Sequence, residues 1–386
     1  MDRVRKIIPS QRHPSQNDKG FTLIELMVAL AATTIVVAAG YTILTATSKA
    51  TRANDQAAGT QYNARVAMER LSRDIRMAGF GMTGPVGNCT TAIVPKDNTP
   101  GGSDTGPDTV SLVVPAVSTA NAAWTLTAEA KGPTTTLSLT AASVTDMVTS
   151  GLKKQTSSAG PPATTTPGST LSIGGVVSVE VNDYSGGTIT LQNPLVSPAS
   201  FPAGTPVYLL KCMTYQVISA PDANNVCGGT APCLVQGEAA AINNCNVAAS
   251  PCSPIVDGIE DLQLAYACDG CNVTAPNPAS TDGVIDDQGA MNGTFDQADF
   301  LSNTNWATPP LTPDKIRLVQ VSIVARQTAT ELGTGETVKA GTNSAVVVLP
   351  DHNHANDASY IANPTAYGQQ RRRLLTHTVE TRNLES

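Results

Sequence analysis

The stretch GFTLIE, residues 20–25, places one carboxylate near the start of an apolar run that otherwise has the composition of a membrane helix. The run covers residues 21–44, which are 24 residues with Glu25 as the only charged side chain. At about 1.5 Å of rise per residue, a helix of this length crosses a hydrocarbon core of about 30 Å. A carboxylate inside such a core is costly without a partner, so Glu25 is a candidate functional residue.

A basic segment precedes the apolar run. Residues 1–20 contain five Lys or Arg residues against two Asp residues, and they end in Lys19-Gly20. A secretory signal peptide has an apolar region of about 7–15 residues that closes on small residues at a cleavage site. The run in this chain is longer and carries an acid. An ordinary membrane anchor also needs no glutamate at its fifth apolar position.

This layout resembles that of type IV prepilins and pseudopilins. The resemblance implies that residues 1–20 are a leader peptide, which a prepilin peptidase cuts between Gly20 and Phe21 before Phe21 is N-methylated. It also implies that Glu25 pairs with the α-amino group of an incoming subunit and sets the register of a filament. An amine and a carboxylate can neutralise each other in an apolar environment, which agrees with that role.

One long helix is predicted after the cut, because no proline occurs between Gly20 and Met82. Its first part, residues 21–44, is expected to be the transmembrane and filament-core segment, and residues 45–79 to be an amphipathic continuation. Apolar residues recur there at spacings of three and four, namely Ala64, Met68, Leu71, Ile75 and Ala78. This stripe needs a surface to cover it, most simply a C-terminal sheet, and Gly79 and Gly81 supply the stop signal.

Composition indicates a β-rich body outside the cytoplasm. The chain has 386 residues, of which 14% are charged and 4% aromatic, and its middle is rich in Gly, Pro, Ser, Thr and Ala. It has 24 basic and 31 acidic residues, so that removal of the leader's five basic and two acidic residues leaves a net charge of −10. Direct binding of nucleic acid is therefore not expected.

Residues 80–203 are predicted to form a β-rich insertion or subdomain. Segments rich in Val, Thr, Ile and Leu alternate there with turn residues, and strands are predicted over Thr109–Val117, Thr134–Ala142, Ile173–Val181 and Gly187–Leu191. In residues 204–386, strands are predicted over Gly204–Cys212, Ile255–Tyr266, Ile316–Arg326 and from Arg371 to Asn383.

Three features resemble the PilW family of minor pilins: the Ala-Gly-Phe end of the long helix at residues 78–80, a cysteine close behind it at Cys89, and an arginine-rich last strand that closes on Arg-Asn. The resemblance implies an α+β, lollipop-like pilin fold. A long N-terminal helix would pack on a β-rich, disulfide-stapled C-terminal head, residues 204–386, with residues 80–203 inserted.

The same resemblance implies a minor pilin that takes part in type IV pilus assembly, in a priming or tip complex. The implied partners are prepilin peptidase, other minor pilins, the major pilin and a tip adhesin. The implied location is the bacterial inner membrane, single-pass with the head in the periplasm, and then the pilus on the cell surface. Two alternatives stay open: a type II secretion pseudopilin of the J kind, although these are usually shorter, and a pilus-tip subunit for adhesion or DNA contact.

Eight cysteines lie beyond the apolar run, at Cys89, Cys212, Cys227, Cys233, Cys245, Cys252, Cys268 and Cys271. An even number in a translocated domain favours disulfides. Their close spacing suggests three local pairs, 227–233, 245–252 and 268–271, which leaves 89 with 212. The Cys268-x-x-Cys271 element alone is insufficient for a zinc site, and the loop that follows it is not the helix of a redox motif.

Three polar clusters are weighed as sites, and each is interpreted as structural. Asp282, Asp286 and Asp287 offer oxygen ligands for Ca²⁺, but they lack the pattern of an EF-hand and are taken as a solvated turn. Residues 351–354 (DHNH) offer two histidines to a metal, yet the segment has the composition of a turn. Residues 371–373 (RRR) are interpreted as edge-strand arginines that are solvated or paired with acids.

No cofactor and no catalytic residues are predicted. The sequence has no Gly-x-Ser-x-Gly elbow, no phosphate-binding loop and no His-Glu-x-x-His motif. The chain is expected to be a structural or assembly protein that serves as the substrate of a peptidase rather than an enzyme.

Overall fold

A computed structural model of the chain describes residues 20–99, 102, 104–116, 118, 123–158, 164–219, 226–228, 231–239, 245, 251–271, 281–288, 294–302, 304–327, 346–368 and 370–384. Apart from Gly20, the expected leader of residues 1–20 lies outside this part of the chain, as does Val117 at the end of a predicted strand.

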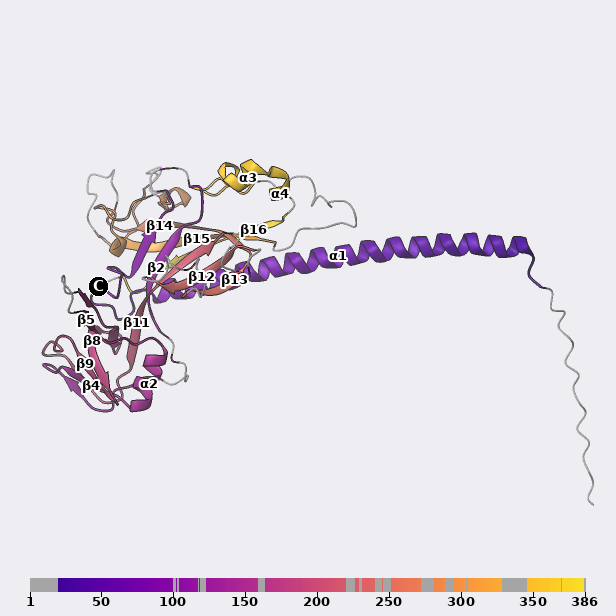
Figure 1. The fold of residues 1–386 in the computed structure, drawn as a ribbon. Helices are drawn as coiled ribbons and strands as arrows, with labels where there is room; N and C mark the ends of the chain where they lie inside the picture. The colour runs from indigo at the N-terminus through magenta and orange to yellow at the C-terminus, as the bar shows by residue number, and fades with distance from the viewer. Residues whose placement is uncertain are drawn as a thin grey trace, which may run out of the picture. The chain divides into compact units, whose positions relative to one another are not determined.

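The N-terminal helix α1 (Leu23–Met77) is a single helix of 55 residues (Figure 1). It contains no proline, and its two glycines, Gly40 and Gly59, have no neighbouring atoms that a side chain would meet. The helix ends where Gly79 adopts a φ of 80°, a left-handed conformation that favours glycine. The backbone N–H of Gly79 donates to the Val113 carbonyl (2.9 Å). The predicted long apolar helix is confirmed.

The second half of α1 carries its apolar stripe into the first hydrophobic core. Buried residues of the stripe and its end are Ala64, Ala67, Met68, Leu71, Ile75 and Ala78. They share this core with side chains of β1 (Ile93–Lys96), β2 (Thr109–Pro115), β11 (Val207–Ile218), β12 (Cys233–Glu238), β14 (Ile259–Cys268), β15 (Ile316–Arg326) and β16 (Arg372–Glu380). Burying a side chain as large as Leu71 contributes about 1.5–3 kcal/mol.

Most strands of the head join one nine-stranded sheet in which every pair is antiparallel. Its main order is β1-β2-β11-β7-β8-β9-β4, and β12 pairs with β11 and with β13. The strands not yet given are β4 (Thr136–Ser138), β7 (Thr170–Ile173), β8 (Val177–Ser185), β9 (Thr188–Leu191) and β13 (Ser253–Asp257). The central strand, β11, is long enough at 12 residues to serve two cores.

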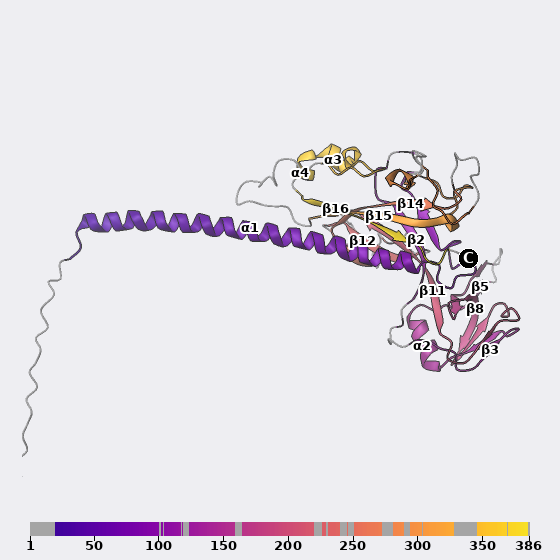
Figure 2. The same ribbon diagram turned by 180° about the vertical axis from the view of Figure 1, so that it is seen from behind.

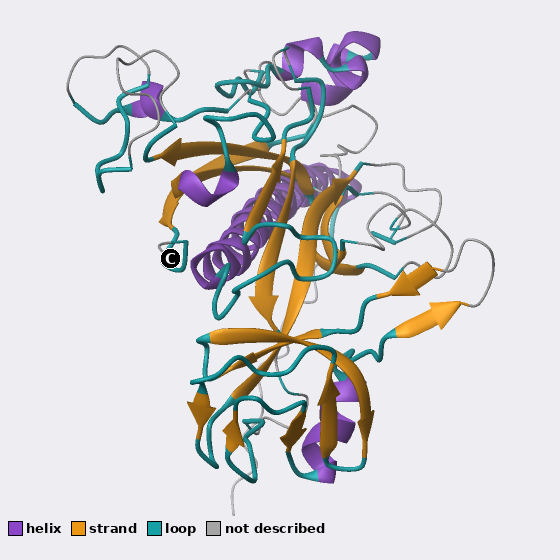
Figure 3. Cartoon of the chain, turned by 90° about the vertical axis from the view of Figure 1, so that its left-hand side faces the viewer, coloured by secondary structure: helices purple, strands orange, loops and turns teal. Residues whose placement is uncertain are grey.

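The second core lies at the other end of β11 and has its own helix, α2 (Ala141–Thr149). Its apolar side chains come from residues 124–209, including Val207 and Leu209 of β11. Figures 2 and 3 show α2 beside β-strands in this part of the head, away from β14 and β15. β1 and β2 also lie within residues 80–203, yet their side chains join the first core because β2 pairs with β11.

A second, three-stranded sheet has the order β14-β15-β16. β14 follows β13 directly, and the residue between them is Gly258, with a φ of 78°. Its N–H donates to the Pro232 carbonyl and its own carbonyl accepts from the Arg326 N–H, each at 2.6 Å. The predicted single strand Ile255–Tyr266 is therefore wrong in one respect, because the chain passes at this glycine from one sheet to the other.

Two other predicted strands also differ from the structure. Ile173–Val181 contains the turn between β7 and β8, because Gly174 and Gly175 adopt φ values of 64° and 73°. Thr134–Ala142 forms β4 and then enters α2, where the Thr140 side chain caps the helix by accepting from the Ser143 N–H (3.0 Å).

The remaining regular elements are short. Two small sheets pair β3 (Ala130–Lys131) with β10 (Ser200–Phe201) and β5 (Thr156–Ser158) with β6 (Thr164–Thr166). The other regular elements in the described part of the chain are two short helices and three 3₁₀ turns, namely α3 (Ala358–Ala362), α4 (Pro364–Gly368), η2 (Gln297–Asp299), η3 (Pro313–Lys315) and η4 (His354–Asn356).

The two halves of α1 lead to different expectations for truncation. Leu71 is 0% exposed, so Leu71→Ala should lower the free energy of unfolding of the head by about 2–5 kcal/mol. Leu30 is exposed on the same helix, and Leu30→Ala should leave it unchanged. Urea unfolding of the detergent-solubilised chain measures both. Equal effects of the two substitutions would contradict the assigned packing.

Candidate functional site

The residues of the expected cleavage and register site lie at the beginning of α1. Gly20 and Phe21 precede the helix and are exposed. The Glu25 carboxylate accepts hydrogen bonds from the backbone N–H and the hydroxyl of Thr22, each at 2.9 Å, and the Thr22 hydroxyl accepts from the Glu25 N–H at 3.3 Å. This is a capping box, so Glu25 also has a local role in starting the helix.

The apolar side chains of residues 21–44 are exposed in the structure. Among the described residues, α1 is the one helix long and apolar enough to cross a membrane, and its apolar window is not buried at all. Hydrophobic side chains on every face of a helix need an apolar environment. An apolar N-terminal helix of this kind is consistent with membrane anchoring.

The buried half of α1 also carries a charged group into the core. Asp74 is 5% exposed and accepts a short hydrogen bond from the Tyr215 hydroxyl of β11. Arg70 and Arg73 make ion pairs with the same carboxylate, at 3.2 and 3.1 Å. Burial and the neighbouring Asp74 charge raise the pKa of Tyr215, so the phenol stays protonated and continues to donate. These contacts fix the rotation of α1 against the sheet.

All eight cysteines are paired. The disulfides join Cys89 to Cys212, Cys227 to Cys233, Cys245 to Cys252 and Cys268 to Cys271, with Cα–Cα distances of 5.6, 5.6, 5.1 and 6.0 Å. These are the pairs that the spacing suggests. The first closes a separation of 123 residues and ties the segment after α1 to β11, whereas the other three close short loops.

Two of the acids considered for Ca²⁺ after Cys271 accept hydrogen bonds from backbone groups. The Asp282 carboxylate accepts from the Val284 N–H (3.0 Å), and that of Asp286 accepts from the Cys271 N–H (2.7 Å). Asp269 accepts from the N–H groups of Asp282 and Gly283, at 3.1 and 3.0 Å. The segment after Cys271 that contains these acids is a turn held by hydrogen bonds. The expected absence of a cofactor at Asp282, Asp286 and Asp287 stays a prediction.

The arginines at the start of β16 have different surroundings. Arg372 forms a bidentate pair with Glu260, at 2.5 and 2.9 Å, and its guanidinium lies 3.3 Å from the Tyr367 ring centroid. Its side chain is only 4% exposed, so it is a structural residue. Arg373 is exposed on this edge strand, and Arg371 is exposed directly before it. The pairing of Arg372 with an acid agrees with the interpretation given from the sequence.

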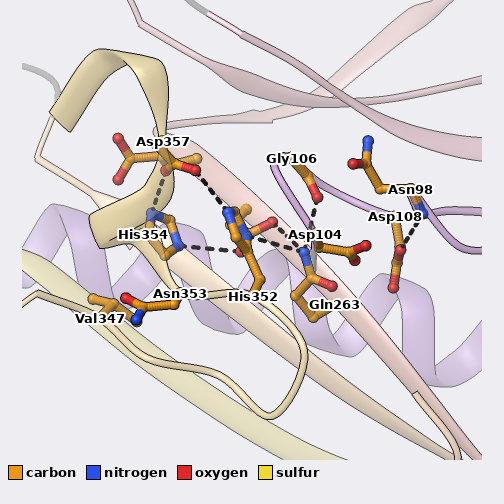
Figure 4. A network of polar contacts seen from close by, with 12 residues as sticks. Asn98, Asp104, Gly106, Asp108, Gln263, Val347, His352, Asn353, His354 and Asp357 are labelled. Atoms are coloured by element: carbon orange, nitrogen blue, oxygen red, sulfur yellow. Dashed lines mark hydrogen bonds and ion pairs between the residues drawn. The ribbon is translucent and has the colours of Figure 1, made fainter. Parts of the chain in front are cut away.

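A buried polar network occupies one face of β14 (Figure 4). Asp261 and Gln263 point to that face, and both are less than 3% exposed. Segment 346–357 covers them with His352 and His354, whose rings stack at a centroid distance of 4.4 Å. His352 contacts Asp261 at 2.7 Å and Asp357 at 2.8 Å.

The second histidine has the same two acidic neighbours. His354 contacts Asp261 at 3.1 Å and Asp357 at 3.1 Å, so both imidazoles lie between the same two carboxylates. Burial acts to lower the pKa of His352, but hydrogen bonds and charges from Asp261 and Asp357 raise it to about 10, and those from the same acids raise the pKa of His354 to about 8.

The acids respond in the opposite direction. Burial acts to raise the pKa of Asp357, but the two imidazoles lower it to about 2, and they also lower the pKa of Asp261. The four groups therefore form two cations and two anions at neutral pH. A protonated imidazole cannot ligate a metal, so Asp261, His352 and His354 form an ion-pair network in that state. This network ties segment 346–357 to β14.

A cluster of acidic residues lies next to the ion-pair network. Gln263 Nε2 donates to the Gly106 carbonyl at 3.1 Å, and loop 97–108 carries Asp97, Asp104 and Asp108. The backbone N–H of Asp104 donates to the carbonyl of Asp351 at 3.2 Å, next to His352. Sequence reasoning did not single out these loop acids. Their signal was three aspartates within 12 residues of a Pro- and Gly-rich loop.

Comparisons with known families agree with this arrangement. The PilW family, described as type IV pilus-assembly protein W, matches residues 219–383. The prokaryotic N-terminal methylation motif matches residues 15–41. No curated protein and no solved structure matches the chain significantly.

The predicted resemblance to the PilW family is therefore confirmed. The chain is a type IV pilus-related, pilin-like protein, and these matches indicate a structural, pilus-assembly kind of protein.

The ion-pair network should make the stability of the head depend on pH. A histidine with a raised pKa contributes stability that is complete below its unfolded value of 6.5 and is lost as pH rises through its folded value. The free energy of unfolding should therefore fall by about 2 kcal/mol or more between pH 6.5 and pH 9. Urea unfolding across this range measures the fall.

Other groups also titrate in this range, because burial and neighbouring acids raise the pKa values of Asp104 and Asp108 to about 7 and about 8. Substitution of one histidine separates the contribution of the ion-pair network from theirs. His354→Gln should reduce the fall with pH, whereas His377→Gln on exposed β16 should not change it. An identical pH profile in native protein and His354→Gln would show that the network is not charged as described.

Proposed function

We propose that this chain is a minor pilin that takes part in type IV pilus assembly, in a priming or tip complex. The observation that carries the proposal is the division of α1: its first half exposes apolar side chains on all faces, and its second half is built into the core of the head. A helix of this kind can pass from a bilayer to the helical core of a filament without refolding, because both environments are apolar.

The proposed sequence of events starts in the bacterial inner membrane, with the head in the periplasm. Prepilin peptidase removes the leader after Gly20 and methylates Phe21, which the methylation motif at residues 15–41 supports. The freed amine lies on the residue next to Thr22, which contacts the Glu25 carboxylate in the precursor. In the filament, Glu25 pairs with the amine of another subunit and sets the register.

The head has the task of contacting other minor pilins, the major pilin or a tip adhesin. A type II secretion pseudopilin of the J kind is the alternative, and the match of residues 219–383 to PilW favours the pilus. A direct role in adhesion or DNA contact draws no specific support from Arg371–Arg373, since Arg372 is held by Glu260.

Glu25→Ala tests the register role in a deletion strain complemented with the variant. The chain should still be cleaved and should accumulate in the inner membrane, but its amount in sheared pili should fall to background, because the amine of the partner subunit loses its counter-charge. Glu69→Ala, an exposed acid further along the same helix, is the matched control and should be incorporated normally. Normal incorporation of Glu25→Ala would contradict the register role.

Cleavage is tested separately at Gly20. Gly20→Val should leave the full-length precursor in the membrane, which intact mass measurement detects as retention of the leader and absence of a methyl group on Phe21. Gly59→Ala, an open glycine position in α1, should be processed like the native chain. Efficient processing of Gly20→Val would place the cleavage site elsewhere.

A further inference from the structure

Loop 97–108 brings three carboxylates together inside the head. Asp97, Asp104 and Asp108 each offer an oxygen atom within 4.8 Å of the others. Asp351 lies beside them, because its carbonyl accepts from the Asp104 N–H and its charge acts on the Asp104 carboxyl. The four acids come from two segments that are far apart in the sequence.

The hydrogen bonds of the cluster leave two carboxylate oxygens without a donor. The Thr99 N–H donates to Oδ1 of Asp97 and of Asp104, both at 2.9 Å. Asp108 accepts from the N–H groups of Asn98 and Leu264, at 3.0 and 2.9 Å. Oδ2 of Asp97 and Oδ2 of Asp104 are buried and have no hydrogen-bond donor.

Asp104 is the decisive member of the cluster. It is 0% exposed, and Figure 4 shows its carboxylate pointing toward Asp108 and Asn98. A buried carboxylate oxygen without a donor costs free energy, and like charges nearby increase this cost. Burial, together with the charges of Asp97 and Asp351, raises the pKa of Asp104 to about 7, because all of these disfavour its charged form.

No basic side chain among the described residues relieves this charge. None of the ion pairs in that part of the chain reaches Asp97, Asp104, Asp108 or Asp351. The nearby cations, His352 and His354, are already held between Asp261 and Asp357. The cluster therefore needs either protons or a cation from solution.

We propose that Asp97, Asp104 and Asp108, with Asp351 beside them, hold a divalent cation, of which Ca²⁺ fits best. The ligand set consists of oxygen atoms alone, which suits a hard cation and excludes the soft metals that prefer Cys or His. Carboxylates on a loop accommodate the variable geometry of Ca²⁺ better than the strict octahedron of Mg²⁺. Sites of extracellular modules work at dissociation constants of about 10⁻⁴–10⁻³ M.

The cation has a structural task in this head. Asp97, Asp104 and Asp108 belong to the connection between β1 and β2, whereas Asp351 belongs to the segment before α3. Asp108 is in turn bonded to the backbone of β14 through Leu264. A bound ion would join these three parts beside the ion-pair network and make one face of the head rigid.

Thermal unfolding of the full-length chain in detergent tests the site. The Tm in EDTA is compared with the Tm in Ca²⁺, and calorimetric titration with Ca²⁺ gives the stoichiometry. At about ten times the dissociation constant, Ca²⁺ should raise the Tm by about 3–6 °C, with one ion per chain. Mg²⁺ at the same concentration should raise it less, and an equal response would overturn the assignment to Ca²⁺.

Two isosteric variants locate the ion. Asp104→Asn should abolish the response to Ca²⁺ while leaving the Tm in EDTA equal to or above that of the native chain, because it removes a buried charge. Asp282→Asn alters the exposed acidic turn and should keep the full response. The proposal is overturned if the native Tm changes with pH but not with Ca²⁺, which would indicate protonated carboxyl groups, or if Asp104→Asn retains the response.

Discussion

The structure depends on one constraint: the apolar side chains at the two ends of a single helix must be removed from water in two different environments. Residues 21–44 of α1 expose theirs, and Leu71 and Ile75 bury theirs completely against the sheets. The helix has no proline or packed glycine that would divide it. Its second half is therefore fixed by the head, through packing and through the Asp74–Tyr215 hydrogen bond, while its first half needs an apolar environment.

The head contains long loops and few aromatic residues, so strand pairing and apolar packing leave some of its segments without a connection. Covalent and ionic links connect segments that strand pairing alone leaves apart. The Cys89–Cys212 disulfide ties the segment after α1 to β11. The network of His352 and His354 holds segment 346–357 on β14, and Arg372 joins β16 to Glu260. Removing one partner from a buried pair of this kind typically costs about 3–5 kcal/mol.

The sequence was sufficient for features that depend on local pattern. The apolar run with Glu25 predicts the helix, and the close spacing of six cysteines suggests three of the four disulfides. Single residues in special conformations were harder. At Gly258 one predicted strand divides into β13 and β14, which belong to different sheets. Thr140 caps a helix where a strand was expected.

The acidic cluster could not be found in the same way. Asp104 and Asp351 are separated by 247 residues, and they meet only because β2 pairs with β11 while segment 346–357 covers β14. Asp261 and Gln263 alternate with apolar residues along β14, but a polar face on a strand is normally solvated. Burial of Asp261 and Gln263 follows from the loops that pack over this face, and strand periodicity does not predict those loops.

The central claim is that the exposed half of α1 packs against other pilins in a filament. Photo-crosslinking from position 36 in sheared pili tests it most directly, with position 176 on the head as a second exposed valine for comparison. Crosslinks should form from position 36 to the helices of other pilin subunits. Recovery of the chain only in the membrane fraction, with position 36 crosslinked to lipid and never to a pilin, would contradict it.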